Sequence, residues 1–174
     1  MSAAPQPPRL TSTRELLLMD LKRLLTVEEL LAKVMLPKLV QEVQDDALKR
    51  ALEEHLQETR GHVEQLKHSF ALLREKPAGA DAPGLEGLKQ EHDSGIQKVA
   101  PALRDGFDAG AAIGSEHYEI AVYSSALLLA QEAAPEVADI LSGNLDEEFA
   151  ALKKLETIAE RLAREATQQP AVPA

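Results

Sequence analysis

The sequence predicts an all-α fold, a four-helix bundle made of two helical hairpins with a short additional crossover helix. Its 174 residues are enough for one domain with a buried core. Hydrophobic residues make up 44% of the chain but aromatic residues only 3%, so the core must consist of the aliphatic side chains typical of packed helices. Apolar residues recur at steps of three and four over four long segments, which is the helical period.

The first predicted helix covers residues 11–43. Its apolar stripe advances by four and three residues in turn and leaves one place vacant, at residue 28. The stripe consists of Leu17, Leu21, Leu24, Leu31 and Met35. Pro37 should kink this helix or end its regular part, because the proline ring removes an amide donor and collides with the preceding turn.

A second helix is predicted over residues 45–75, where Asp45 or Asp46 suits the positive end of the helix dipole. Proline and glycine then concentrate in residues 76–84, which indicates a connection. Because this connection lies halfway along the chain, it suggests a crossover between two hairpins, with residues 85–99 as its short helix.

The third predicted helix covers residues 101–133 and contains Gly106, Gly110 and Gly114 at steps of four. Each glycine costs about 1 kcal/mol relative to alanine in a helix, so we expect this row to let a neighbouring helix approach closely. Pro135 opens the fourth helix, since proline suits the first helical turn.

The two ends of the chain have a different composition. Segments 1–10 and 167–174 are rich in proline and are expected to be disordered, which leaves residues 11–166 for the bundle. The N-terminal segment lacks the charged and apolar regions of a secretory signal, so cytoplasmic localisation is the default expectation. The longest uncharged stretch, residues 120–131, is shorter than the ~18 apolar residues that a membrane helix needs.

Charge and cysteine content exclude several functions. The chain carries 19 basic and 29 acidic side chains, a formal net charge of −10. This charge repels phosphate backbones, and no run of lysine and arginine forms a basic stripe, so neither nucleic acid nor a membrane surface is an expected partner. The chain has no cysteine, which excludes disulfides, thiolate ligands and iron–sulfur clusters. Any metal would have to be bound by histidine and carboxylate side chains.

Glutamates fill the vacant places on the apolar stripes. Glu28 lies on the first helix, Glu116 on the third, and Glu148 on the fourth, which is predicted over residues 135–164. Glu119 shares the face of Glu116. Antiparallel packing brings the middles of helices to the same level, so we expect these acids to converge. Taken singly, each glutamate could instead lie at the edge of its stripe and reach water.

The second helix places His55, Glu58 and His62 on one side. Two imidazoles with a carboxylate between them suit a metal in the bundle core, and a hydrogen-bonded histidine pair is the alternative. Buried carboxylates need a cation or a dense hydrogen-bond network, so we predict a metal site. His68 and His92 are expected at the surface.

Five short motifs occur in an order and spacing that resemble a known family. The most specific is Glu-His-Tyr-Glu-Ile-Ala, which begins at Glu116, and the next is His-Leu-x-Glu-Thr, which begins at His55. Val-Glu-Gln-Leu at residues 63–66, Glu-Lys-Pro at residues 75–77 and Leu-Asp-Glu-Glu at residues 145–148 also match. The chain thus resembles the YciE/YciF-like branch of the ferritin-like superfamily. The resemblance implies a ferritin-like bundle, often dimeric, associated with bacterial stress response and with a di-iron site.

Carried onto this chain, the resemblance implies ligands from all four helices. The predicted metal ligands are Glu28, His55, Glu58, His62, Glu116, Glu119 and Glu148. Glu29 is the alternative to Glu28, depending on where one extra residue before Pro37 is placed. The Glu-x-x-His pair of typical di-iron bundles is absent, and Leu152 stands where the family often has an acidic residue. A partial or single-metal site is therefore an alternative.

We therefore expect a protein that binds two iron ions, or manganese, in the bundle core and acts with oxygen or peroxide, with a homodimer as its expected assembly. Glu116 or Glu58 would bridge the ions. The alternative is a non-enzymatic stress-associated bundle that acts through contacts with a partner chain. In that case the face with Gly106, Gly110 and Gly114 would matter most.

Overall fold

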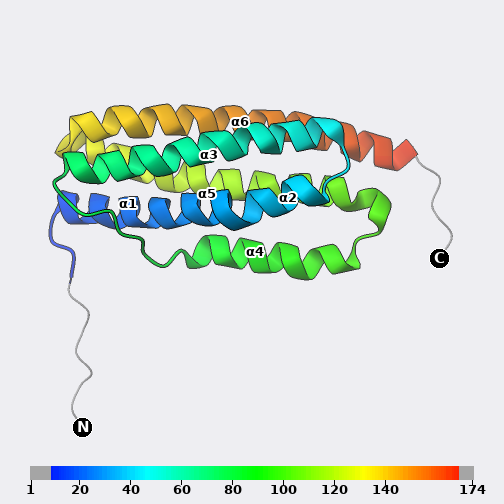
Figure 1. Cartoon of the computed structure of the whole chain (residues 1–174), viewed down its shortest axis with the longest axis horizontal. Coiled ribbons are helices and arrows are strands. Elements are labelled where there is room, and N and C mark those ends of the chain that lie inside the picture. Colours follow the sequence, from blue (N-terminus) through cyan, green and yellow to red (C-terminus); the bar gives the residue numbers. More distant parts are fainter. Residues whose placement is uncertain (1–8, 169–174) are drawn as a thin grey trace, which may run out of the picture.

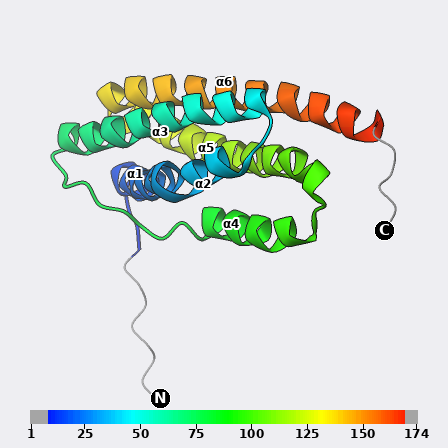
Figure 2. The same ribbon diagram turned by 45° about the vertical axis from the view of Figure 1, so that its right-hand side comes forward.

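The chain folds into a bundle of long helices, shown in two orientations in Figures 1 and 2. The structure is a computed structural model that describes residues 9–168. The disorder predicted for residues 1–8 and 169–174 lies outside the described residues, whereas residues 167 and 168 continue the last helix. The elements are α1 (Thr13–Leu30), η1 (Leu31–Met35), α2 (Leu36–Glu42), α3 (Asp46–Leu72), α4 (Pro83–Gly95), η2 (Ile96–Lys98), η3 (Pro101–Leu103), α5 (Arg104–Ala133) and α6 (Pro135–Gln168).

Four helical rods make up the bundle. The first rod, formed by α1, η1 and α2, packs against α3 and α5, and α6 packs against the same two helices. The helix α4 lies outside this group against α5, within the crossover from α3 to α5 (Figure 1). The predicted four-helix bundle with a crossover helix is therefore confirmed. Among the helices of residues 9–168, none combines the length and apolarity required to cross a membrane.

The first rod does not end at Pro37. Residues Leu31–Met35 form a π-helical turn, in which the Leu36 amide donates to the carbonyl oxygen of Leu31, five residues back. A wider turn leaves room beside the backbone, and Pro37 then lies in the first turn of α2, where a missing amide costs little. A π-helical turn thus takes the place of the expected kink or end.

Local backbone geometry fixes the ends of α3. Asp45 caps its start, because the Asp45 carboxylate accepts hydrogen bonds from the amides two and three residues further on. The helix ends at Leu72, earlier than the predicted residue 75. The reason is Arg74, which adopts a left-handed φ of 58°, while the Glu75 amide returns to a carbonyl five residues back.

Two aliphatic clusters form the core, one toward each end of the bundle. The first cluster combines the start of α1 and α6 with the end of α3 and α5. The second combines the end of α1, η1 and α2 with the start of α3, α4, the start of α5, and Leu155 of α6. On every rod the change from one cluster to the other falls near the glutamates or histidines singled out in the sequence. The fold therefore places these polar residues at one level.

The glycine row of α5 does not bring a neighbouring helix close. A Cβ atom built on Gly106 or Gly110 would meet nothing within 4 Å, and one on Gly114 would only reach a side-chain carbon of Leu88 at 4.0 Å. The expected close approach is therefore wrong for the residues that the structure describes. Close packing occurs instead at the end of α4, where a Cβ on Gly95 would lie 2.5 Å from the Phe107 ring.

His92 is buried, not at the surface as expected. It is 8% exposed, its Nε2 atom lies 2.7 Å from Asp108 Oδ1, and its ring stacks on Phe107 with centroids 5.5 Å apart. The prediction failed because α4 packs lengthwise on α5, a contact that the short apolar pattern of α4 did not reveal. His68 is exposed, as predicted, and His117 is exposed too.

The glycine geometry leads to a stability prediction. Replacing Gly110 with alanine should raise the free energy of unfolding by about 0.5–1 kcal/mol, because alanine favours the helix and meets no neighbour. Gly95→Ala should lower it, because the new methyl group would overlap the Phe107 ring, which is itself stacked on His92. Urea denaturation measures both. Loss of stability in Gly110→Ala would contradict the open face of α5.

Candidate metal centre

A layer of buried polar side chains crosses the middle of the bundle, and every rod contributes to it. The helix α1 supplies Glu28, α3 supplies His55 and His62, α5 supplies Glu116 and Glu119, and α6 supplies Glu148. None of the six is more than 2% exposed. The helical period explains this placement, because the acids occupy stripe positions that otherwise hold aliphatic residues.

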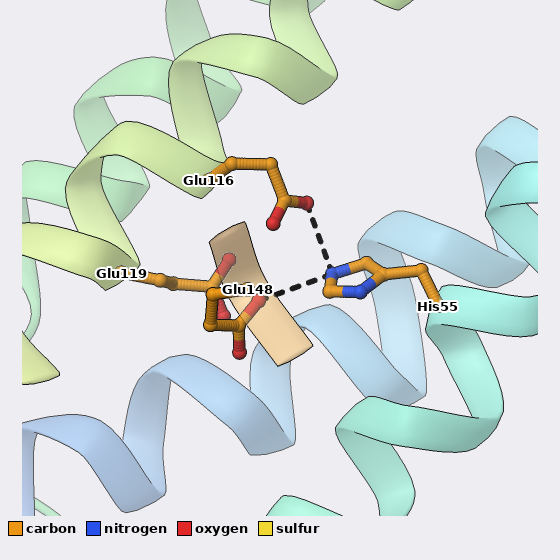
Figure 3. Close-up of side chains that lie close together, drawn as sticks. All are labelled: His55, Glu116, Glu119 and Glu148. Atoms are coloured by element: carbon orange, nitrogen blue, oxygen red, sulfur yellow. Dashed lines mark ion pairs between the residues drawn. The ribbon is translucent and has the colours of Figure 1, made fainter. Parts of the chain in front are cut away.

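One group in the layer contains His55, Glu116, Glu119 and Glu148, whose side chains converge from α3, α5 and α6 in Figure 3. One possible ligand atom from each residue lies within 4.8 Å of the others. His55 Nε2 is 3.0 Å from Glu116 Oε1 and 3.9 Å from Glu148 Oε2. Three carboxylates around one imidazole nitrogen are a donor set that suits iron or manganese.

A second group shares one residue with the first. It contains Glu28, His62 and Glu148, again with one possible ligand atom each within 4.8 Å of the others. His62 Nδ1 lies 3.0 Å from Glu148 Oε1 and 3.4 Å from Glu28 Oε1. The oxygens of Glu148 therefore face both histidines, which is the position of a carboxylate that could bridge two ions.

Tyr123 supports the second group from one side. Its hydroxyl donates to Glu28 Oε1 at 2.5 Å and accepts from Asn144 Nδ2 at 3.2 Å. Burial raises the pKa of Tyr123 well above its ordinary value, so the phenol keeps its proton and acts as a donor. One oxygen of Glu28 is thereby held in place, and the other has no hydrogen-bond partner among residues 9–168.

Many polar atoms of the layer lack hydrogen-bond partners in the described residues. Such atoms cost free energy in a dry interior, and native proteins keep few of them. They are Glu28 Oε2, both ring nitrogens of His55, His62 Nδ1, Glu116 Oε2, and both carboxylate oxygens of Glu119 and of Glu148. All belong to residues of the two groups, and divalent cations in the layer would satisfy all of them except His55 Nδ1, which faces Glu58. The residues present therefore fit a metal.

Burial also raises the pKa values of the acids. Loss of water raises the pKa of Glu28, Glu119 and Glu148 above the ordinary value of 4.5. The neighbouring carboxylates raise the pKa of Glu119 further, because two negative charges repel each other at close range. Without a cation, these three carboxyl groups therefore keep their protons to a higher pH than a glutamate in water does.

The histidines hold protons as well. Burial by itself lowers the pKa of His62, but the carboxylates of Glu148 and Glu28 outweigh it and raise the pKa from 6.5 to about 10. Burial likewise lowers the pKa of His55, and Glu116 beside it raises the pKa well above 6.5. The metal-free layer thus offsets its negative charge with protons, which a metal ion would displace.

The structure brings six of the seven predicted ligands together and leaves Glu58 outside both groups. Glu58 lies behind His55, with its Oε2 atom 3.6 Å from His55 Nδ1, and its side chain is 31% exposed. The structure also separates the two alternatives on the first helix. Glu28 lies in the layer, whereas Glu29 forms an ion pair with Lys33 toward the solvent. Leu152 is part of the apolar wall and brings no donor.

Two polar contacts of the layer were not predicted from the sequence. Asn144 lies one turn before Glu148 on the inward side of α6, so its place on the stripe was a signal that could have been found. Glu147 contacts His62 with its Oε2 atom 2.8 Å from Nε2, although its own side chain is 51% exposed. Glu147 lies at the edge of α6, outside the apolar stripe, so the stripe pattern alone could not identify it.

These features define an all-α bundle with a buried histidine–carboxylate layer. Residues 12–168 match the family described as "Domain of unknown function (DUF892)". The chain belongs to this family, and the resemblance to the YciE/YciF-like branch is confirmed.

Two relatives illustrate the similarity. Protein YciF of Escherichia coli (strain K12) is 33% identical over 129 residues, which are 71% of this chain and 76% of the relative. The crystal structure of that E. coli stress protein matches with a TM-score of 0.82 and 26% identity, over 89% of this chain and 99% of the other. A structure of YcfI from Rhodopseudomonas palustris, described as a candidate structural protein, matches with a TM-score of 0.81 and 33% identity, over 84% and 94% of the two chains.

The pKa shifts predict how the metal-free protein responds to pH. The three acids keep protons above pH 4.5, where the unfolded chain releases them, and His62 keeps its proton to about pH 10 instead of 6.5. The folded state therefore binds more protons just above pH 4.5 and between pH 6.5 and about 10, so its stability must fall as pH rises through these ranges. We expect a loss of at least ~1 kcal/mol between pH 5.5 and 8, measured by denaturation with a chelator present.

A variant serves as the control for this pH dependence. Glu119→Gln removes one acid that keeps its proton and should give a shallower fall, since glutamine does not titrate in this range. A metal-free wild type whose stability rises from pH 5.5 to 8 would contradict the protonation of the layer.

Proposed function

We propose that this protein binds two divalent ions, iron or manganese, in the histidine–carboxylate layer, and that bound iron reacts with oxygen or peroxide. The observation that carries the proposal is a set of buried side-chain nitrogen and oxygen atoms that have no hydrogen-bond partner in the described part of the chain; all of them belong to residues of the two ligand groups. A layer with four buried carboxylates and two histidines has little other physical justification.

The donor count supports two ions. Ferritin-like di-metal bundles use about four glutamates and two histidines, and this layer contains four glutamates and two histidines. Glu148 belongs to both groups and would bridge the ions, whereas Glu28 and Glu119 each belong to one. The sequence had suggested Glu116 or Glu58 as the bridge, and the positions in the structure favour Glu148.

The surroundings of the layer suit redox chemistry. Iron held by carboxylates and imidazoles with an open position can transfer electrons to oxygen or peroxide. The aliphatic clusters on both sides limit the access of water, and Tyr123 holds one oxygen of Glu28 in place. The relative YciF is called a stress protein, and removal of peroxide or of free iron would fit such a role in this chain.

A second candidate function is a bundle that acts through contacts with another chain. The observation that favours it is the open groove between α4 and α5, lined by Leu88, Phe107 and the glycine row. The description of the R. palustris relative is compatible with this role. If the layer binds metal, contacts with another chain cannot be the protein's whole function.

The shared position of Glu148 predicts distinct metal stoichiometries. Wild type should bind two Mn(II) or Fe(II) ions per chain under anaerobic conditions. Glu28→Ala and Glu119→Ala should each retain one, because each removes a ligand of one group, whereas Glu148→Ala should weaken both. Elemental analysis and titration followed by EPR of free Mn(II) measure the stoichiometry. Glu156→Ala, at an exposed position on α6, is the matched control.

The contrary results are equally distinct. A wild type that binds no ion at micromolar metal would refute the metal proposal and favour the second candidate. Two ions in all the variants would place the metal elsewhere. Circular dichroism must show unchanged helix content in each variant, so that loss of metal is not loss of fold.

Loaded with Fe(II) and then exposed to oxygen or peroxide, wild type should develop the near-ultraviolet absorption of ferric carboxylate centres. Glu119→Ala should react more slowly, because it retains one ion and loses the paired site. Stopped-flow absorption checks the rates. An equal rate in both proteins would show that pairing of the ions does not matter for the reaction.

A further inference from the structure

His62 is held between two consecutive glutamates of α6. Its Nδ1 atom faces the layer, 3.0 Å from Glu148 Oε1, while its Nε2 atom faces outward, 2.8 Å from Glu147 Oε2. Glu148 is fully buried, but the side chain of Glu147 is 51% exposed. One helix thus contacts both nitrogens of the ring, one from inside the bundle and one from its surface.

The outer contact determines which nitrogen is available to a metal. Once a metal ion displaces the second proton of His62, the neutral imidazole keeps one N–H group, and an ionised carboxylate only accepts hydrogen bonds. Glu147 therefore favours the tautomer in which Nε2 carries the hydrogen. The lone pair of Nδ1 is then directed into the group formed by Glu28 and Glu148, where Nδ1 lacks a hydrogen-bond partner among the described residues.

We propose that Glu147 is a positioning residue, which fixes the tautomer and ring orientation of His62 so that Nδ1 binds metal. The inference rests on the proposed function, since it concerns how one of the two ions is held. It assigns a role to a half-exposed residue that lies outside both ligand groups. Carboxylates in this position raise the basicity of the histidine and its affinity for metal.

The other histidine is held less firmly. His55 faces the layer with Nε2, and its outward Nδ1 atom lies 3.6 Å from Glu58 Oε2, too far for a hydrogen bond. The two ion positions are therefore not equivalent. Loss of Glu147 should affect only the ion bound by His62, and loss of Glu58 should have a smaller effect on the ion bound by His55.

The test uses Zn(II), a diamagnetic probe, in the full chain. In Glu147→Ala one of the two binding constants, that of the ion held by His62, should fall by about 10- to 100-fold, while the other stays unchanged. Glu147→Gln should restore most of the affinity, because the amide oxygen can still accept from Nε2. Asp146→Ala removes the same charge from the neighbouring exposed residue and should bind as wild type does.

A second readout separates positioning from stability. Long-range ¹H–¹⁵N correlation spectra of Zn(II)-loaded protein should show a hydrogen on Nε2 of His62 and metal on Nδ1. Glu147→Ala should show both tautomers or a shifted Nδ1 resonance, which a merely structural role would not produce.

The results distinguish the two proposals. Wild type without any bound Zn(II) would overturn the metal site and this inference together. Two ions in wild type, with unchanged affinity and an unchanged His62 tautomer in Glu147→Ala, would overturn the role of Glu147 and leave the metal site intact.

Discussion

The cost of burying four carboxylates in an aliphatic bundle is the constraint on which the rest of this structure depends. Such charges are tolerated only where cations, protons or hydrogen bonds compensate them. All the compensating groups, two imidazoles, a phenol and an amide, lie at the same level as the acids. The rods must therefore keep their register, since sliding one rod by a turn would separate charges from their partners. The aliphatic clusters on both sides maintain that register.

Much of this layer could be predicted from the sequence, because it depends on helical periodicity. Glu28 and Glu148 interrupt otherwise regular apolar stripes, and antiparallel packing then implies their convergence. Contacts made from the edge of a helix could not be predicted in this way. Glu147 lies on no stripe, and the burial of His92 depends on how the crossover helix packs. The prediction from the glycine row of α5 was wrong for a related reason. Small residues permit a neighbouring helix to approach closely but do not require it to do so.

The distribution of ligands explains why a motif search alone would miss the site. Di-metal bundles of the ferritin-like type pair a glutamate with a histidine three residues later on each of two helices. Here both histidines come from α3, and α5 supplies Glu116 and Glu119 instead. The numbers of carboxylate and imidazole donors are the same, although they are assigned to different helices. Geometry around the donors, not a linear pattern, defines this class of site.

The π-helical turn at Leu31–Met35 has a consequence for how this rod tolerates changes in length. In a regular α-helix each residue adds ~100° of rotation, so Glu28 and Leu36, eight positions apart, would point ~80° apart. The wider turn absorbs about one residue of that rotation, and both side chains face the interior. The π-helical turn thus accommodates one extra residue within the helix, without forming a loop. Removing one residue there would restore an ordinary helix and leave Leu36 and Leu39 facing the interior with Glu28, so this rod tolerates the loss of one residue at the turn.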